Sequence, residues 1–192
     1  MERARIKAPM NPCYICVDVE SAGPHPGGYS LLSIGAATVT QPRKSFYVEL
    51  KPINDQQTGE AESIHGMSLE ELAQKGVPPQ QAMQGFADWL AEVSGDDEPV
   101  FVAFNAPFDW MFVADYFHTY LGHNPFGHRA LDIKALFMGL HGVRWQDTSY
   151  QMIANHYGLH DSLPHNALQD AEQEAEMLTA MLEELKEKSH EQ

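Results

Sequence analysis

The chain has 192 residues, of which 43% are hydrophobic, and its formal net charge is −15. The length suits one globular domain with a substantial core, whereas the acidic charge argues against broad binding to long duplex nucleic acid, which requires a basic face. No run of about 18 apolar residues marks a transmembrane helix, and residues 1–7 lack the apolar stretch of a secretory signal. We therefore expect a cytoplasmic protein with no membrane partner.

The first half of the chain predicts a β-meander. Residues 13–19 form an apolar run typical of a buried strand, and a loop rich in Gly and Pro follows over 21–28. Residues 29–40 and 45–50 predict the next two strands. Residues 54–76 are expected to be mostly loop.

The second half predicts strands and helices in alternation. Helices are expected over residues 68–73, 79–93, 147–157 and 166–187, and strands over 100–104 and 130–133. Pro107 is placed to open a further helix. We infer an α/β fold with a mixed sheet of about five strands and helices on both faces. Residues 1–11 are predicted to be a loose arm, and residues 12–188 a single domain.

Cys13 and Cys16 form one C-x-x-C pattern within the first predicted strand. Residues three apart on a strand face opposite sides, and a second ligand pair for a zinc site is not evident in the sequence. Two reduced and mostly buried cysteines are therefore expected.

Asp18 and Glu20 are candidate metal ligands at the end of the same strand. Because they are two residues apart, their side chains leave the same face of the sheet, whereas Val17 and Val19 point into the core. A solvated strand face would show the same D-x-E pattern, so this pair alone does not decide between the two interpretations.

Asp109 lies in the first turn of the helix that Pro107 opens. The helix dipole favours a carboxylate there, but the position also follows a buried strand, where open α/β sheets bind their ligands. Asn105 could cap this helix or hold the turn.

His165 and Asp170 lie at the start of the last predicted helix. The loop position gives His165 the reach that a general base needs, whereas Asp170, one turn into the helix, is held rigidly like a metal ligand. The alternative for His165 is a solvated loop histidine. We expect Glu172, Glu174 and Glu176 to form a solvated helix face.

Four carboxylates at element ends repel one another unless divalent cations lie between them. Such a cluster predicts a metal site, and a metal beside a poised histidine suggests hydrolysis of a phosphate ester. A small basic patch for an anionic substrate could come from Arg43, Lys44, Arg129 or Arg144.

These pieces together resemble the DEDDh branch of the DnaQ-like 3′–5′ exonucleases, over roughly residues 13–182. Asp18 and Glu20 match the D-x-E motif, Asp109 matches N-x-x-F-D, and residues 165–170 match H-x-A-x-x-D. Residues 64–68 also resemble the I-H-G-[IM]-[TS] loop of the family.

The resemblance implies an RNase H-like fold and two divalent cations, Mg²⁺ or Mn²⁺. It assigns Asp18, Glu20, Asp109 and Asp170 to the metals and makes His165 the general base. The partner would be the 3′ end of single-stranded DNA, RNA or a short oligonucleotide, and the product a nucleoside 5′-monophosphate. Family relatives also include dimers, so a homodimer is possible.

For the terminal nucleotide, the resemblance implies contacts from Ser21, Ala22, His65 and Met67, together with Asn105. The sequence departs from the family at two places: Ser21-Ala22-Gly23 replaces the usual Thr-Thr-Gly, and Phe104 replaces a histidine. Neither change removes a metal ligand or the base.

An RNase T-like or oligoribonuclease-like exoribonuclease stays open as an alternative, and a catalytically silent nucleic-acid-binding module is less favoured. The sequence leaves open the choice of DNA or RNA, the substrate length, and whether the chain works alone or as a proofreading subunit.

Overall fold

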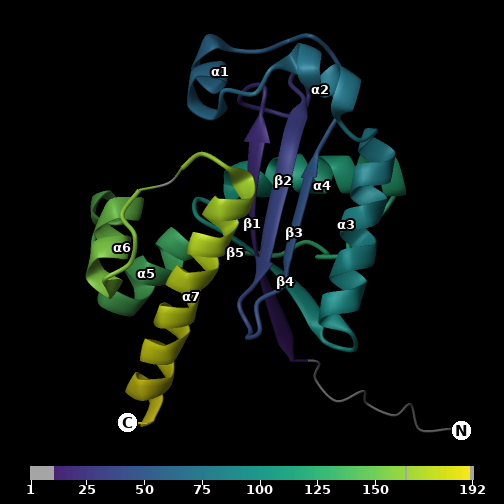
Figure 1. Cartoon of the computed structure of the whole chain (residues 1–192). Coiled ribbons are helices and arrows are strands. Elements are labelled where there is room, and N and C mark those ends of the chain that lie inside the picture. The colour runs from purple at the N-terminus through teal and green to yellow at the C-terminus, as the bar shows by residue number, and fades with distance from the viewer. Residues whose placement is uncertain (1–10, 163, 191–192) are drawn as a thin grey trace, which may run out of the picture.

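The computed structural model describes residues 11–162 and 164–190, so the predicted arm lies almost entirely outside the described residues. Five strands form one sheet in the order β3-β2-β1-β4-β5, with helices on both of its faces (Figure 1). This is the mixed five-stranded α/β architecture that the element order predicts. Among the described helices, none is long and apolar enough to span a membrane.

The first strand, β1, is central and carries the D-x-E motif. It pairs antiparallel with β2 and parallel with β4, while β3 and β5 form the sheet edges. The strands are β1 Pro12–Ser21, β2 Leu31–Thr38, β3 Ser45–Glu49, β4 Glu98–Ala103 and β5 Ala130–Asp132. The opening meander is therefore confirmed, with strand ends that differ by at most two residues from the predicted ones.

Alternation along β1 divides the core into two layers. Ile15, Val17 and Val19 pack on the side that α3 and α4 cover, whereas Cys16 packs on the side of α5, α6 and α7. Cys13 belongs to the first layer, and both cysteines are free and buried. Asp18 and Glu20 share the parity of Cys16, so they leave the sheet towards α7.

The helices are α1 Gly59–His65, α2 Leu69–Lys75, α3 Pro79–Ser94, α4 Pro107–Leu121, α5 Ile133–His141, α6 Tyr150–Tyr157 and α7 Ala167–His190. The Ser68 hydroxyl caps α2 by accepting from the Glu71 amide at 3.3 Å, as the capping-box pattern predicts. The expected loop over residues 54–76 is wrong in part, because Thr58 caps an additional helix, α1. None of the residues of α1 is buried, so it lacks the apolar stripe that makes a helix recognisable in a sequence.

The N-terminal end of α7 lies directly on β2. A Cβ atom on Gly35 would lie 2.1 Å from the carbonyl carbon of Ala167, so only glycine permits this approach. Gly35 is also the β2 partner of Asp18. This close approach of helix and sheet therefore lies beside the D-x-E motif.

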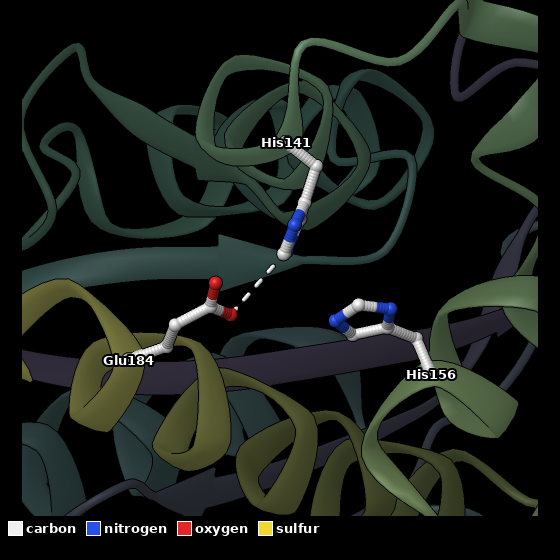
Figure 2. A group of neighbouring side chains, drawn as sticks. All are labelled: His141, His156 and Glu184. Carbon is white, nitrogen blue, oxygen red and sulfur yellow. Dashed lines mark ion pairs between the residues drawn. The ribbon is translucent and has the colours of Figure 1, made fainter. Parts of the chain in front are cut away.

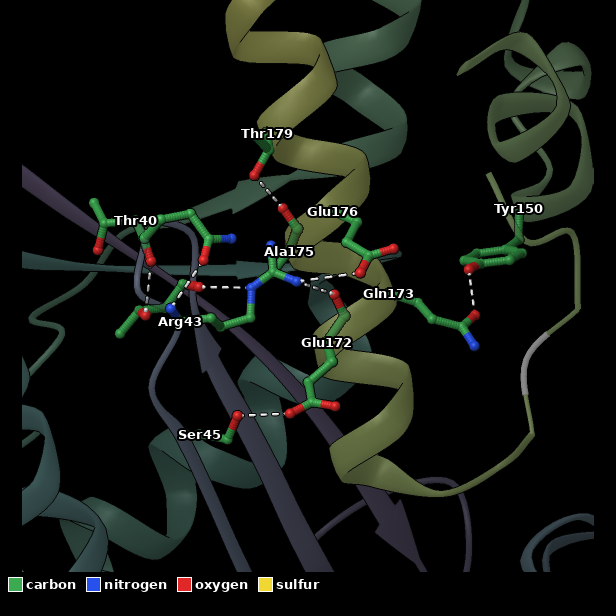
Figure 3. Close-up of polar contacts among 11 residues, drawn as sticks. Thr40, Arg43, Ser45, Tyr150, Glu172, Gln173, Ala175, Glu176 and Thr179 are labelled. Atoms are coloured by element: carbon green, nitrogen blue, oxygen red, sulfur yellow. Dashed lines mark hydrogen bonds and ion pairs between the residues drawn. The ribbon is translucent and has the colours of Figure 1, made fainter. Parts of the chain in front are cut away.

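Further along α7, the turn between β2 and β3 holds the helix through Arg43 (Figure 3). The guanidinium donates to the backbone carbonyl of Thr38 at 3.2 Å and of Glu172 at 3.3 Å, and it pairs with the Glu176 carboxylate at 3.4 Å. Ser45 adds a hydrogen bond to the Glu172 carboxylate at 2.6 Å. These contacts fix the position of α7 across the sheet.

We expect Gly35→Ala to lower the melting temperature by about 4–10 °C, because the added methyl group meets backbone atoms and over-packing of this kind costs about 1–3 kcal/mol. Thermal unfolding followed by circular dichroism measures this. Gly85→Ala, at an exposed position of α3 with open space around it, is the matched control and should leave the melting temperature unchanged or higher. Equal melting temperatures for wild type and Gly35→Ala would contradict the close approach.

Candidate active site

Four carboxylates from three elements converge at one end of β1. Oxygens of Asp18, Glu20 and Asp170 all lie within 4.8 Å of one another, which is close enough to share a metal ion. Asp109 joins them from the start of α4, since its Oδ1 accepts a hydrogen bond from the Val19 amide at 3.1 Å. The structure thus brings together the four acids that the sequence predicts.

The turn before α4 places Asp109. Asn105 adopts a left-handed conformation with φ of 63°, and its carbonyl accepts from the Phe108 amide at 3.1 Å. The Ala106 amide donates to the Asp132 carboxylate at 2.7 Å. Asn105 therefore holds the turn and does not cap the helix, and Asp132, which the sequence reasoning missed, ties this turn to the end of β5.

The Asp170 carboxylate is held through one of its two oxygens. Its Oδ2 accepts from the Asn166 amide at 3.1 Å, and the Asn166 side chain in turn accepts from the Gln169 amide at 3.2 Å. The other oxygen, Oδ1, is buried and accepts no hydrogen bond from any residue that the structure describes. A buried carboxylate oxygen without a donor is a natural place for a cation.

His165 lies in the exposed loop before α7 and has a left-handed backbone, with φ of 56°. It directly precedes Asn166, whose amide donates to the Asp170 carboxylate at 3.1 Å. The histidine is therefore beside the acid cluster and open to solvent, as a base that deprotonates water must be.

Burial and mutual repulsion make this cluster costly to ionise. Burial, with the charges of Asp109 and further acids, raises the pKa of Asp18 well above its ordinary value. Burial and the charge of Asp170 raise the pKa of Glu20 to about 7. Burial raises the pKa of Asp170 itself to about 6, against the opposing effect of the Asn166 amide. The charge of a divalent cation would offset both the desolvation of these acids and their mutual repulsion.

Glu174 is a fifth buried acid on the same side of α7 as Asp170, one helical turn further along. It is 1% exposed, so the expectation that it lies on a solvated face is wrong. Burial and the charge of Asp109 raise the pKa of Glu174 well above its ordinary value. The spacing of four residues from Asp170 indicates that Glu174 lies on the same helix face as that acid. Glutamates at this spacing are also common on solvated helices, so the spacing alone does not predict burial.

A cleft of about 340 Å³ opens beside Glu20. Ser21 and His65 line it, together with Ile64 and Phe108, which the sequence reasoning did not assign to the substrate. Its full lining is Val19, Glu20, Ser21, Gly23, Pro24, Thr58, Glu60, Ala61, Ile64, His65 and Phe108.

The other residues expected to touch the substrate lie differently. The Ala22 side chain is fully buried, and its amide and carbonyl are both hydrogen-bonded within the protein. Met67 packs against the cluster of Ala22, Leu32 and Leu72. The Met67 amide donates to His65 Nδ1 at 2.9 Å, so it sets the orientation of that ring. Asn105 is exposed, at the turn before α4.

The four basic side chains that could form a basic patch each pair with a carboxylate. Besides Arg43 with Glu176, the pairs are Lys44 with Glu92, Arg129 with Glu98 and Arg144 with Asp147. Binding of an anionic substrate would therefore depend on metal cations held by the acid cluster more than on these basic side chains.

The raised pKa values predict a pH-dependent response to divalent cations. Unfolded Asp and Glu titrate near pH 4, so between about pH 4 and 7 the metal-free folded protein keeps protons that the unfolded chain releases, and its free energy of unfolding falls as the pH rises. Cations bind the ionised cluster, so the melting temperature should rise with Mn²⁺ more at pH 8 than at pH 5.

Differential scanning fluorimetry with EDTA or with Mn²⁺ across this pH range checks the prediction. Asp18→Asn is the comparison variant, because it removes one charge of the cluster and should weaken the effect of Mn²⁺ at pH 8. An equal rise in melting temperature at pH 5 and pH 8 would contradict the assignment of the cluster as the cation site.

Known proteins resemble the chain in sequence and in fold. Residues 13–182 match the family described as the 3′-5′ exoribonuclease Rv2179c-like domain. The 3′-5′ DNA exonuclease Cap18 of Escherichia coli is 44% identical over 176 residues, which are 91% of this chain and 94% of the relative.

Two solved structures share the fold at low sequence identity. The nuclease domain of 3′hExo, a DEDDh family member bound to rAMP, superimposes with a TM-score of 0.71 at 16% identity, covering 90% of this chain and 91% of that one. The zinc-bound complex of E. coli exonuclease I with single-stranded DNA gives a TM-score of 0.72 at 15% identity over 88% of this chain, which spans only 40% of that longer chain.

The match to the family covers nearly the whole domain, includes all three acidic motifs, and agrees with the convergence of their side chains in space. The chain therefore belongs to the 3′-5′ exoribonuclease Rv2179c-like domain family, and it is a 3′–5′ exonuclease.

Proposed function

We propose that this exonuclease is metal-dependent and removes nucleotides from the 3′ end of single-stranded or short nucleic acid, releasing nucleoside 5′-monophosphates. The observation that carries the proposal is the convergence of Asp18, Glu20 and Asp170, with Asp109 bonded to the same strand and His165 beside them. Carboxylate-only ligands suit Mg²⁺ or Mn²⁺.

The proposed role of each acid depends on which of its carboxylate oxygens are available to bind a cation. Asp18, Glu20 and Asp170 would hold one divalent cation, and Asp18 would contribute to a second. Asp109 has one oxygen engaged by the Val19 amide, so it would act on the second cation through its other oxygen or through water. Bound cations of this kind lower the pKa of water and stabilise the charge on the leaving oxygen.

His165 would accept the proton of the attacking water as that water approaches the terminal phosphate. The loop that carries it is exposed, whereas the acids are anchored to β1, α4 and α7. The base can therefore move with the substrate while the cation site keeps its shape.

The cleft beside Glu20 has the size of a small-ligand site, and we assign the terminal nucleotide to it. Phe108 and the exposed side chain of Ile64 offer apolar surface to the base. Burial lowers the pKa of His65. This residue therefore supplies a neutral imidazole ring to the cleft that Ser21 also lines. Nucleotide contacts from Met67 and Asn105 stay predictions.

Single-stranded DNA is the substrate that we propose first, because the relative that is 44% identical is a DNA exonuclease. Short RNA is the second candidate, since the family model describes an exoribonuclease. The negative charge of the chain fits short or single-stranded ends better than long duplexes. A cytoplasmic location and a homodimer are further proposals, which fractionation and light scattering would test.

A degradation assay tests the activity and the substrate together. A 5′-labelled oligonucleotide of DNA or RNA, incubated with Mg²⁺ or Mn²⁺, should shorten stepwise from its 3′ end, and a 3′-phosphorylated copy should resist. Asp18→Asn should lower the rate by at least about 10³-fold, because it removes a ligand from both cation positions. Undiminished turnover by this variant would rule out the assigned role.

For His165→Ala, we expect kcat to fall by about 10²–10⁴-fold while Mn²⁺ affinity, measured by calorimetry, stays within about twofold. His160→Ala, at another exposed histidine of the same loop, is the control and should keep wild-type kcat. A collapse of Mn²⁺ affinity in His165→Ala would make this residue a ligand instead of a base.

Ile64→Ala should raise KM for oligonucleotides by about 3–10-fold with little change in kcat, because the base loses apolar contact area in the cleft. Ile53→Ala is a close match, since Ile53 is 46% exposed, Ile64 is 47% exposed, and Ile53 is not part of the cleft lining. If both variants shift KM equally, Ile64 has no special contact with the substrate.

A further inference from the structure

A second group of metal-ligating side chains lies far from the acid cluster. His141 at the end of α5, His156 on α6 and Glu184 on α7 each offer one ligand atom, and these atoms all lie within 4.8 Å of one another. Figure 2 shows the two imidazoles and the carboxylate turned towards one another across the gap between their helices. Glu184 is fourteen residues beyond Asp170 on the same helix, or about 21 Å along its axis.

The spacing of the atoms fits a tetrahedral site. Bonds of about 2.0–2.1 Å from zinc to nitrogen or oxygen place neighbouring ligands about 3.3 Å apart. Nε2 of His141 and Oε2 of Glu184 are 3.3 Å apart. His156 is exposed, so its ring is free to make the small movement that would complete the set. Three protein ligands leave a fourth position for water.

The surroundings of Glu184 resemble the outer shell of a metal site. The Tyr157 hydroxyl donates to Oε2 at 2.6 Å and lies 3.1 Å from Nε2 of His141, and the Lys188 ammonium contacts the other oxygen, Oε1, at 2.8 Å. Lys188 also donates to the carbonyl of Leu140 in the last turn of α5, at 3.3 Å. These contacts orient the carboxylate towards His141, in the way that hydrogen-bond partners orient the ligands of a metal.

The surroundings of His141 favour its neutral form. The ring centroids of His141 and His156 are 4.5 Å apart, so protonating both would place two positive charges together beside Lys188. Burial lowers the pKa of His141, and the charges of His156 and Lys188 act in the same direction against that of Glu184. A neutral imidazole keeps the lone pair that binds a metal.

We propose that His141, His156 and Glu184 form a site for Zn²⁺ or a similar transition-metal ion, which braces α5, α6 and α7 against one another. Two nitrogens and one oxygen favour Zn²⁺ over Mg²⁺, whereas the oxygen-only cluster of Asp18, Glu20 and Asp170 favours the harder cation. The chain would then separate this metal, which links three helices, from the cations of the acid cluster by ligand chemistry.

Calorimetric titration with Zn²⁺ tests the site in the full chain. Asp18→Asn serves as background, because it weakens Zn²⁺ binding at the acid cluster. This variant should bind Zn²⁺ at one site, and its melting temperature at a Zn²⁺ concentration of 100 Kd should rise by about 5–10 °C. Adding His156→Gln should lower the affinity at least about tenfold and abolish the rise. Adding His118→Gln, at an exposed histidine of α4, is the matched control and should change neither.

Nuclear magnetic resonance of the imidazole nitrogens identifies the ligands directly. Zn²⁺ should shift the ring-nitrogen signals of His141 and His156 in the Asp18→Asn background, and the single His156→Gln variant should keep wild-type nuclease activity with Mg²⁺. Failure of the Asp18→Asn chain to bind Zn²⁺, or unchanged affinity after His156→Gln, would overturn the proposal. Because none of these ligands belongs to the acid cluster, loss of this site and loss of the nuclease function are distinguishable.

Discussion

The repulsion among carboxylates buried at the end of β1 is the constraint on which the rest of the structure depends. Asp18, Glu20 and Asp170 share one small volume, and Asp109 and Glu174 lie at its border. Bringing such charges together opposes folding, so their positions must be imposed by packing elsewhere. The two-layer core, the seating of α7 on β2 and the Arg43 contacts supply that packing.

The same constraint explains why the acids lie on regular secondary structure and His165 lies in a loop. The acids sit on strand and helix backbones whose amides hold them, as Val19 holds Asp109 and Asn166 holds Asp170. His165 is instead in an exposed loop. In the proposed mechanism, a cation site needs fixed distances between its ligands, whereas a base must follow the water that it deprotonates, so each proposed role lies in the kind of segment that suits it.

Local patterns in the sequence were enough to predict the sheet and the four acids that converge at the end of β1. The two-residue spacing of Asp18 and Glu20 and the position of Asp109 after a buried strand are properties that strand and helix geometry determine. Asp132 and Glu174 were missed because their roles depend on which element packs against them. The helix α1 was missed because a short polar segment has no periodic signal, and the roles of Ile64 and Phe108 depend on where that helix lies.

The absence of any buried residue in α1 has a consequence for how this enzyme can vary. One wall of the cleft beside Glu20 packs against the core, through Val19 and Phe108, and substitutions there change the free energy of unfolding. The opposite wall, with Glu60, Ala61 and Ile64, contributes nothing to the core. Mutations in α1 can therefore accumulate at little cost in stability. With the terminal nucleotide in this cleft, as we propose, such mutations would change which 3′ ends are accepted without altering the acid cluster.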